Sequence, residues 1–201
     1  EAALGGDEVG FFCKALMFPM LQSLEAARFE APTPPPPHLD AAPNYKLADS
    51  IRIRSMDDVA YLESTVEAEL AAYRAFRPDV VFTENQFSAA ISTAVASLPL
   101  VSTAAWRNHP EFKSPLYDER GCVTGVEDNF NLVLRRYGLE PIQDVWELAN
   151  GRSALNLAPV IPELEPRLAE FPNTHYVGAL LYQGIELGPV PLELSEDRSR
   201  R

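Results

Sequence analysis

The sequence predicts an α/β fold in which helices cover both faces of an open parallel β-sheet. An apolar segment at 79–83 is followed by a helical pattern at 87–97 and then by a second strand-like segment at 100–104. A strand, a helix and a strand in so short a stretch form a β-α-β unit, whose strands run parallel and whose crossover is right-handed. With 46% hydrophobic and 23% charged residues, the 201-residue chain has enough apolar side chains to form a core.

The amino-terminal residues have the pattern of a helix end that leads into a strand. Residues 1–4 resemble a last helical turn, Gly5 and Gly6 supply a left-handed stop, and residues 9–13 are continuously apolar, as in a buried strand. We therefore expect that an upstream strand and most of a helix belong to the same domain. This domain would cover 1–188, and 189–201 would be the start of an interdomain linker or a polar tail.

The clearest helical pattern covers residues 55–77. Ser55 is placed to cap this helix, and Asp57 and Asp58 would lie in its first turn, where the helix dipole favours negative charge. Pro78 would end it. One apolar stripe runs along the helix and consists of Val59, Leu62, Val66, Leu70 and Tyr73.

The remaining segments give shorter or weaker patterns. Further helices are expected at 16–27, 128–137 and 142–149, and further strands at 29–31, 154–157 and 175–177. Residues 38–54 show no clear period, which predicts a long loop. The proline-rich segment 32–37 is either a ligand for an aromatic groove of a partner domain or a stiff surface connection.

Charge and motifs exclude several classes of function. Against 17 Lys and Arg residues stand 29 Asp and Glu residues, a net charge of −12, so we expect no nucleic-acid partner. Two cysteines are too few for a disulfide scaffold, although one disulfide stays open, and no apolar run is long enough for a membrane span, so we expect a cytoplasmic protein. The three histidines lie far apart, which predicts no metal site. Neither a glycine-rich diphosphate loop nor a serine nucleophile elbow occurs.

Polar residues follow three of the predicted strands. Lys14 follows the first, the Glu-Asn-Gln segment 84–86 the second, and the Trp-Arg-Asn-His segment 106–109 the third. Because ligands of open parallel sheets bind at the carboxyl ends of the strands, these residues would form one polar rim suited to a hydroxylated organic ligand. Each has a structural alternative. Glu84 would favour the start of the next helix, and Trp106 and His109 would serve as packing.

Five segments together resemble the amino-terminal half of two-domain nucleotide-sugar glycosyltransferases, the GT-B architecture. The likeness is closest to bacterial enzymes that glycosylate natural products such as macrolides, aromatic polyketides and enediynes. Its most telling pieces are Arg-Pro-Asp-Val-Val at 77–81 and Tyr-Val-Gly at 176–178. The segments are 3–9, 76–81, 89–101, 131–141 and 163–178.

This resemblance implies the Rossmann-like, acceptor-binding half of an inverting enzyme that uses no metal and no cofactor. A nucleotide sugar would be the co-substrate, held mainly by a separate carboxyl-terminal donor-binding domain. A histidine base from before residue 1 would take the proton of an acceptor hydroxyl, and the acid that polarises this base corresponds to Glu84. The acceptor, a small and partly apolar natural product, would contact Asn85, Trp106, Asn108, His109, Phe112 and Tyr117.

Two functions stay open on the sequence. The chain is either the acceptor half of a glycosyltransferase, inactive on its own, or a non-catalytic small-molecule-binding or accessory protein of the same fold. The residues by themselves support a parallel α/β domain with a polar rim, and the enzyme class rests on the resemblance.

Overall fold

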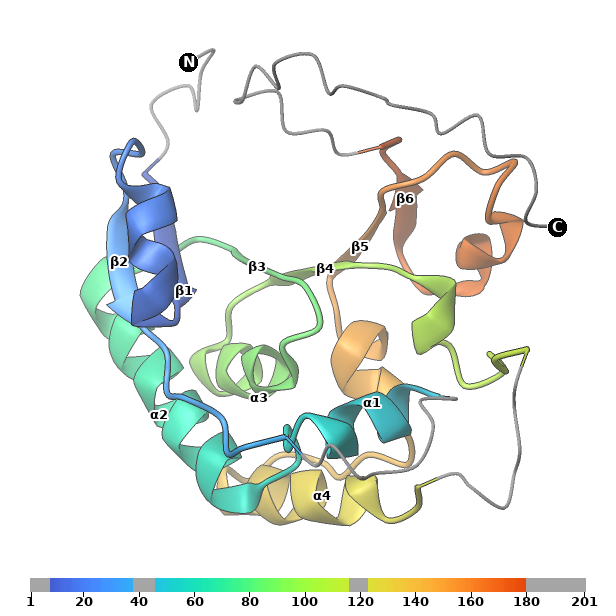
Figure 1. Ribbon diagram of the computed structural model, residues 1–201, viewed down its shortest axis with the longest axis horizontal. Coiled ribbons are helices and arrows are strands. Elements are labelled where there is room, and N and C mark those ends of the chain that lie inside the picture. Colours follow the sequence, from blue (N-terminus) through green and yellow to red (C-terminus); the bar gives the residue numbers. More distant parts are fainter. Residues whose placement is uncertain (1–7, 38–45, 116–122, 180–201) are drawn as a thin grey trace, which may run out of the picture.

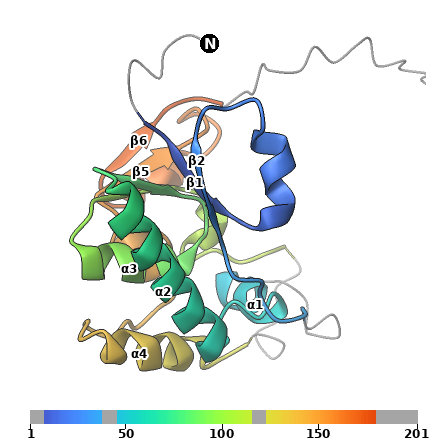
Figure 2. The same cartoon turned by 90° about the vertical axis from the view of Figure 1, so that its left-hand side faces the viewer.

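The computed structural model describes residues 8–37, 46–115 and 123–179 (Figure 1). The strands in these residues are all parallel and form two sheets, one of two strands and one of four. Helices α2 and α3 lie on one side of the strands, whereas the 3-10 helix η1 lies on the other side of β1 and β2 (Figure 2). The predicted parallel α/β fold with helices on both faces is therefore confirmed.

The four-stranded sheet has the order β3-β4-β5-β6. Its strands are β3 (Val81–Thr83), β4 (Leu100–Thr103), β5 (Leu155–Ala158) and β6 (Thr174–Tyr176). Helix α3 (Phe87–Ala96) connects β3 to β4, which confirms the predicted β-α-β unit. In the register, Phe82 pairs with Val101 and Ser102 pairs with Asn156, so the carboxyl ends of β3, β4 and β5 meet at one edge.

The two-stranded sheet consists of β1 (Gly10–Cys13) and β2 (Ala27–Glu30). They are connected through η1 (Ala15–Leu21), so the α-helix expected at 16–27 is wrong in type and in length. Pro19 lies inside η1 and cannot donate the backbone hydrogen bond that an α-helix needs. Leu16 and Met20 are 72% and 73% exposed, so no packing stabilises a longer helix there.

Helix α2 (Val59–Phe76) begins four residues later than predicted. Asp58, rather than Ser55, caps it by accepting a hydrogen bond from the backbone N–H of Tyr61 at 2.8 Å. Ser55 has a left-handed φ of 53° and donates its hydroxyl to the carbonyl of Pro36 at 2.9 Å. This bond holds the proline-rich segment against the domain, which favours its interpretation as a stiff surface connection.

The segment 38–54, expected to be a loop, contains helix α1 (Leu47–Ile53), and its residues 38–45 lie outside the described part of the chain. Asp49 explains this helix. Its carboxylate accepts hydrogen bonds from the backbone N–H groups of Lys46 and Val123, both at 2.8 Å, so it closes the first turn and joins it to the approach to α4. A seven-residue helix that is stabilised by such polar contacts shows little helical periodicity of apolar residues in its sequence.

Helix α4 (Val126–Arg136) agrees with the prediction to within two residues at its start. The helix expected at 142–149 is wrong in type, because the chain forms a π-helical turn, η4 (Glu147–Gly151). There the N–H of Arg152 donates to the carbonyl of Glu147, five residues earlier, at 2.8 Å.

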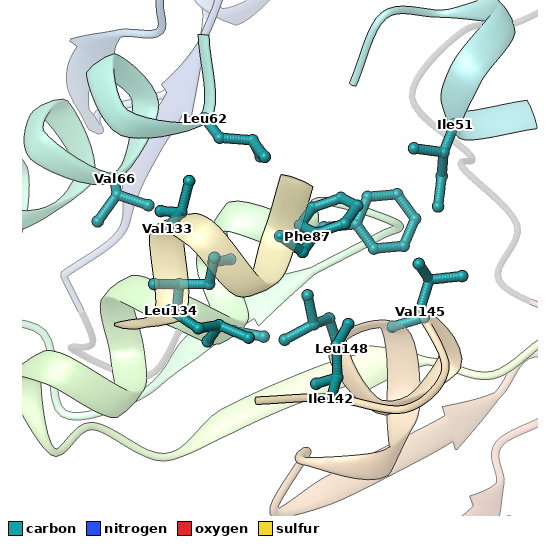
Figure 3. Packing of buried hydrophobic residues seen from close by; sticks show 14 of the residues in the cluster. Ile51, Leu62, Val66, Phe87, Val133, Leu134, Ile142, Val145 and Leu148 are labelled. Atoms are coloured by element: carbon teal, nitrogen blue, oxygen red, sulfur yellow. The ribbon is translucent and has the colours of Figure 1, made fainter. Parts of the chain in front are cut away.

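The main core lies between the four-stranded sheet and helices α1 to α4 (Figure 3). Phe130, Val133 and Leu134 of α4 are fully buried. The rings of Phe87 and Phe130 lie 5.7 Å apart at 58°, a tilted arrangement favourable to aromatic pairs. A second, smaller cluster of Ala104, Ala158, Leu168 and Phe171 covers the carboxyl edge of the sheet, and this edge carries the candidate site.

Candidate functional site

The turn between β3 and α3 carries the predicted site residues Glu84 and Asn85. Asn85 has a left-handed φ of 52°, which asparagine tolerates better than most residues. Its Oδ1 accepts a hydrogen bond from Nδ2 of Asn108 at 2.8 Å, so the turns after β3 and β4 are joined. Glu84 is exposed, and none of the described residues forms a hydrogen bond or an ion pair with it. Since Gln86 occupies the N-cap position of α3, Glu84 is not its cap.

Three buried asparagines lie beneath this edge: Asn108 of η2 (Trp106–Asn108), Asn150 of η4 and Asn156 of β5. Nδ2 of Asn150 donates to the carbonyl of Thr103 at 2.9 Å and to Oδ1 of Asn156 at 2.7 Å. Nδ2 of Asn156 donates to the carbonyls of Asn150 at 3.0 Å and Pro172 at 2.8 Å. A buried amide is costly unless it is hydrogen-bonded, so this asparagine network fixes the strand ends beneath the site.

The sequence predicted that Asn108 contacts the acceptor, but it did not predict the side chains to which Asn108 is hydrogen-bonded. Asn108 is 2% exposed, and its Nδ2 is directed to Asn85 and, at 3.4 Å, to Oδ1 of Asn150. Asn156 carried a signal in the sequence, since it interrupts the apolar strand Leu-Asn-Leu-Ala of β5. The geometry gives Asn108 a supporting position and leaves Asn85 nearer the surface.

The half-buried rings of Trp106 and His109 belong to an aromatic cluster at the same edge. The imidazole of His109 stacks between Trp106, at 4.5 Å and 20°, and Phe171, at 5.3 Å and 14°. Trp146 meets the imidazole edge-on at 5.8 Å, and its Nε1 is buried without a partner among the described residues. Nδ1 of His109 accepts a hydrogen bond from the N–H of Glu111 at 3.2 Å, so the ring proton of the neutral form is on Nε2.

Arg167 of η5 (Pro166–Glu170) closes the outer side of this aromatic cluster. Its guanidinium carbon lies 3.8 Å from the centre of the Trp106 ring, within the range of a cation–π contact. It also forms ion pairs with Glu111 and Glu170. Hydrogen bonding to Arg167 lowers the pKa of Glu170. The charged side chains of Arg167, Glu111 and Glu170 therefore lie beside the aromatic cluster at the rim.

Glu69 of α2 is a buried carboxylate that the sequence analysis missed. It is 2% exposed and accepts hydrogen bonds from the hydroxyls of Ser88 and Ser92 of α3, both at 2.7 Å. Nε2 of Gln86 donates to Ser88 at 2.9 Å, which ties the buried carboxylate to the turn that carries Glu84. The sequence contains a sign of this buried carboxylate, because Glu69 is a charged residue seven positions after Leu62, on the apolar stripe of α2.

Burial is the main influence on the ionisation of this group. It raises the pKa of Glu69 to about 7, although the hydrogen bonds from Ser92 and Ser88 lower it. Burial, together with the charge of Glu69, also raises the pKa of Tyr73, whose hydroxyl lies 3.0 Å from that of Ser92. The turn after β3 is therefore supported by a group that titrates near neutral pH.

Phe112 and Tyr117 are the remaining residues that were predicted to contact the acceptor. Phe112 is half-buried, and its N–H donates to the carbonyl of His109 at 2.9 Å, whereas Tyr117 lies outside the described residues.

Within residues 8–37, 46–115 and 123–179, no cluster of His, Cys, Asp or Glu side chains is suited to hold a metal ion. No helix of that part of the chain is both long and apolar enough to cross a membrane.

Comparison with solved structures shows which proteins share this fold. The chain matches the calicheamicin glycosyltransferase CalG4 with a TM-score of 0.60 at 14% identity, and the glycotransferase of kitacinnamycin with 0.62 at 17%. It matches the Streptomyces sp. SF2575 glycosyltransferase SsfS6 with 0.55 at 15%. The fold is that of half a GT-B glycosyltransferase. The matches cover 90%, 91% and 90% of this chain but 46%, 46% and 48% of those proteins, so the chain spans about half their length.

Sequence comparison adds no assignment. No protein-family model matches the chain, and no curated protein matches it. At 14% to 17% identity the structural matches establish the fold alone.

Proposed function

We propose that the chain is the acceptor-binding half of an inverting, metal-independent glycosyltransferase of the cytoplasm. In this reaction a sugar moves from a nucleotide sugar to a hydroxyl of a small, partly apolar natural product. The observation that carries the proposal is the fold match, because 90% of this chain aligns with under half of a glycosyltransferase. The donor nucleotide would be held mainly by a second domain.

The rim residues suit the roles that this reaction needs. Glu84 is exposed, has no partner among the described residues and follows a strand end, as an acid that orients a histidine base requires. His109 does not suit the role of that base, because its Nδ1 lone pair already accepts a hydrogen bond and its ring is stacked between two others. Trp106 and Phe112 would contact the apolar part of the acceptor.

Acceptor binding can be measured through the intrinsic fluorescence of the protein. The two tryptophans of the chain, Trp106 and Trp146, both lie in the aromatic cluster. We expect a saturable change in emission when an apolar polyketide or macrolide aglycone is added. Trp106→Ala should weaken binding about tenfold, since a buried aromatic contact contributes on the order of 1.4 kcal/mol. Trp146→Phe should bind normally, and a flat response to every aglycone would contradict the proposal.

Transfer itself tests the assignment to half an enzyme. The chain alone, incubated with a nucleotide sugar and the aglycones, should give no product, since the donor-binding domain and the histidine base would come from outside it. Turnover by these 201 residues alone would refute this assignment. Aglycone binding without transfer, even after a donor-binding domain is joined to the chain, would instead favour a non-catalytic binding or accessory protein.

A further inference from the structure

The indole of Trp106 has one face that is filled from within the aromatic cluster. The imidazole of His109 stacks on it, with ring centres 4.5 Å apart and 20° between the planes. Phe171 stacks in turn on this imidazole, at 5.3 Å and 14°, and belongs to the small core cluster at the carboxyl edge. A ligand that entered on this side would have to break a stack that is anchored in the core.

The other face of the same indole is covered by Arg167. The guanidinium carbon lies 3.8 Å from the ring centre, which is a stacking distance. A planar imidazole and a planar guanidinium are too wide to lie side by side over one indole at 4.5 and 3.8 Å from it, so they occupy opposite faces. A ring that stacks on Trp106 must therefore take the place of one of these two groups.

Arg167 is the easier of the two groups to displace, because its contacts lie at the surface. Its side chain is 47% exposed, and those of its ion-pair partners Glu111 and Glu170 are 65% and 47% exposed. Ion pairs and cation–π contacts in such surroundings contribute little, since water and salt screen them. A guanidinium that leaves the indole is hydrated again, so the outer face can be opened at a small cost.

We propose that the outer face of Trp106 is the stacking site for a planar aromatic ring of the acceptor, and that Arg167 competes with this ring for the face. The inference rests on the proposed function and narrows the class of acceptor to hydroxylated aromatic compounds. The guanidinium is itself planar, so it fills the space that a stacked ring would fill. A puckered, saturated ring system touches a planar indole with fewer atoms and would gain less from displacing Arg167.

The contacts of Arg167 favour displacement to the side over closure on top of the acceptor. Its Nε donates to Oε1 of Glu170 at 3.0 Å and its Nη2 to Oε2 of the same residue at 3.2 Å, while Nη2 also donates to Glu111. Glu170 belongs to η5 and Glu111 to the turn after η2, so two separate segments hold the guanidinium at one height above the indole. A ring inserted between the two groups would double this height and break both ion pairs. We therefore expect that removal of the Arg167 side chain strengthens acceptor binding.

Titration of the 201-residue chain with 2-naphthol, a neutral planar aromatic alcohol, tests the proposal. The chain has two tryptophans, and the indole N–H signal of Trp106 in NMR spectra, assigned with Trp146→Phe, reports binding at this face. Arg167→Ala should bind 2-naphthol about three- to tenfold more tightly than the unmodified protein, because the competing group is gone. Arg167→Lys should lie between them, since a compact ammonium covers an indole less completely. Arg135→Ala removes an exposed charge from α4 and should leave the affinity unchanged.

The saturated counterpart decahydro-2-naphthol separates stacking from general apolar binding. It should shift the Trp106 signal only at higher concentrations than 2-naphthol does, and Arg167→Ala should change its affinity by less than about twofold. An equal gain for both alcohols would contradict the restriction to planar rings.

Two further results would overturn the proposal. Unchanged or weaker binding of 2-naphthol to Arg167→Ala would mean that Arg167 does not compete for the face. A Trp106 signal that stays in place in every variant, with urea unfolding showing that each is folded, would mean that the outer face takes no ring. The proposed function fails separately: stronger 2-naphthol binding by Arg167→Ala, with no natural-product aglycone bound by either form, would leave the stacking site and remove the acceptor assignment.

Discussion

The two sheets differ in how completely they are buried, although both are parallel. In the four-stranded sheet Leu100, Asn156 and Ala158 are at most 3% exposed, and the buried amide is fully engaged. In the two-stranded sheet every residue of β1, η1 and β2 keeps part of its surface exposed. Apolar sequence alone therefore does not make a core, because the Gly-Phe-Phe-Cys segment of β1 is no less apolar than β4.

The difference follows from what covers each sheet. Helices α2, α3 and α4 enclose the main core above the four-stranded sheet (Figure 3). Among the residues that the structure describes, η1 is the one element on the outer face of β1 (Figure 2), and its Leu16 and Met20 are exposed. The free energy of folding should accordingly be concentrated in the four-stranded part.

The largest expected effect comes from the centre of the main core. Phe130→Ala should lower the free energy of unfolding by about 3–5 kcal/mol, because it removes a fully buried ring and leaves a cavity. Met20→Ala in η1 is the control and should change it by less than about 0.5 kcal/mol, since this side chain is 73% exposed. Urea unfolding measures both. Equal losses in the two variants would mean that the sheets contribute alike.

Glu69 gives a test in which pH is the variable. Its pKa is raised to about 7 in the folded protein, above its value of about 4.3 in an unfolded chain. Between these values the folded state binds more protons, so the free energy of unfolding falls as pH rises from about 4 to 7 and is constant above. Relative to Glu69→Gln, the unmodified protein should lose about 3–4 kcal/mol over this interval.

The measurement is a series of urea unfolding curves at pH 4 to 8 for both forms. Other carboxylates contribute equally to the two forms and cancel in the difference. A difference independent of pH would show that the carboxyl of Glu69 does not titrate between these limits.

A smaller loss is expected from the asparagine network beneath the rim. Asn150→Ala should cost about 2 kcal/mol, because it leaves the carbonyl of Thr103 and the amide of Asn156 without their partner. Asn150→Ala combined with Asn156→Ala should cost less than the sum of the two single changes, since both remove the same bond. Strict additivity in the unfolding free energies would argue that the two amides act separately.

The sequence predicted the parts of the fold that depend on local pattern. The β-α-β unit of β3, α3 and β4 follows from short apolar strands and clear stops, and it is present as expected. Helix α1 could not be predicted in this way, because Asp49 fixes it through the N–H of Val123, 74 positions away. The type of η1 depends on Pro19, which the sequence shows, and also on the exposure of Leu16 and Met20, which helical spacing alone does not reveal.

The same distinction between local pattern and distant contacts applies to the residues of the site. The rule on carboxyl ends placed Glu84, Asn85 and Asn108 at one edge, and the bond between Asn85 and Asn108 shows that two of them do meet. Whether a side chain faces a ligand or the interior depends on distant residues, as with Asn108 and Asn150. Glu69 could have been found, because a charge on an apolar stripe is a recognisable exception.

The smallest expected effect concerns Phe82 of β3. Phe82→Ser should change the free energy of unfolding by less than about 0.5 kcal/mol, because the ring is 57% exposed. Urea unfolding compares this variant with Phe130→Ala, which removes a fully buried ring. Losses of similar size in the two variants would mean that Phe82 is also covered in the folded protein.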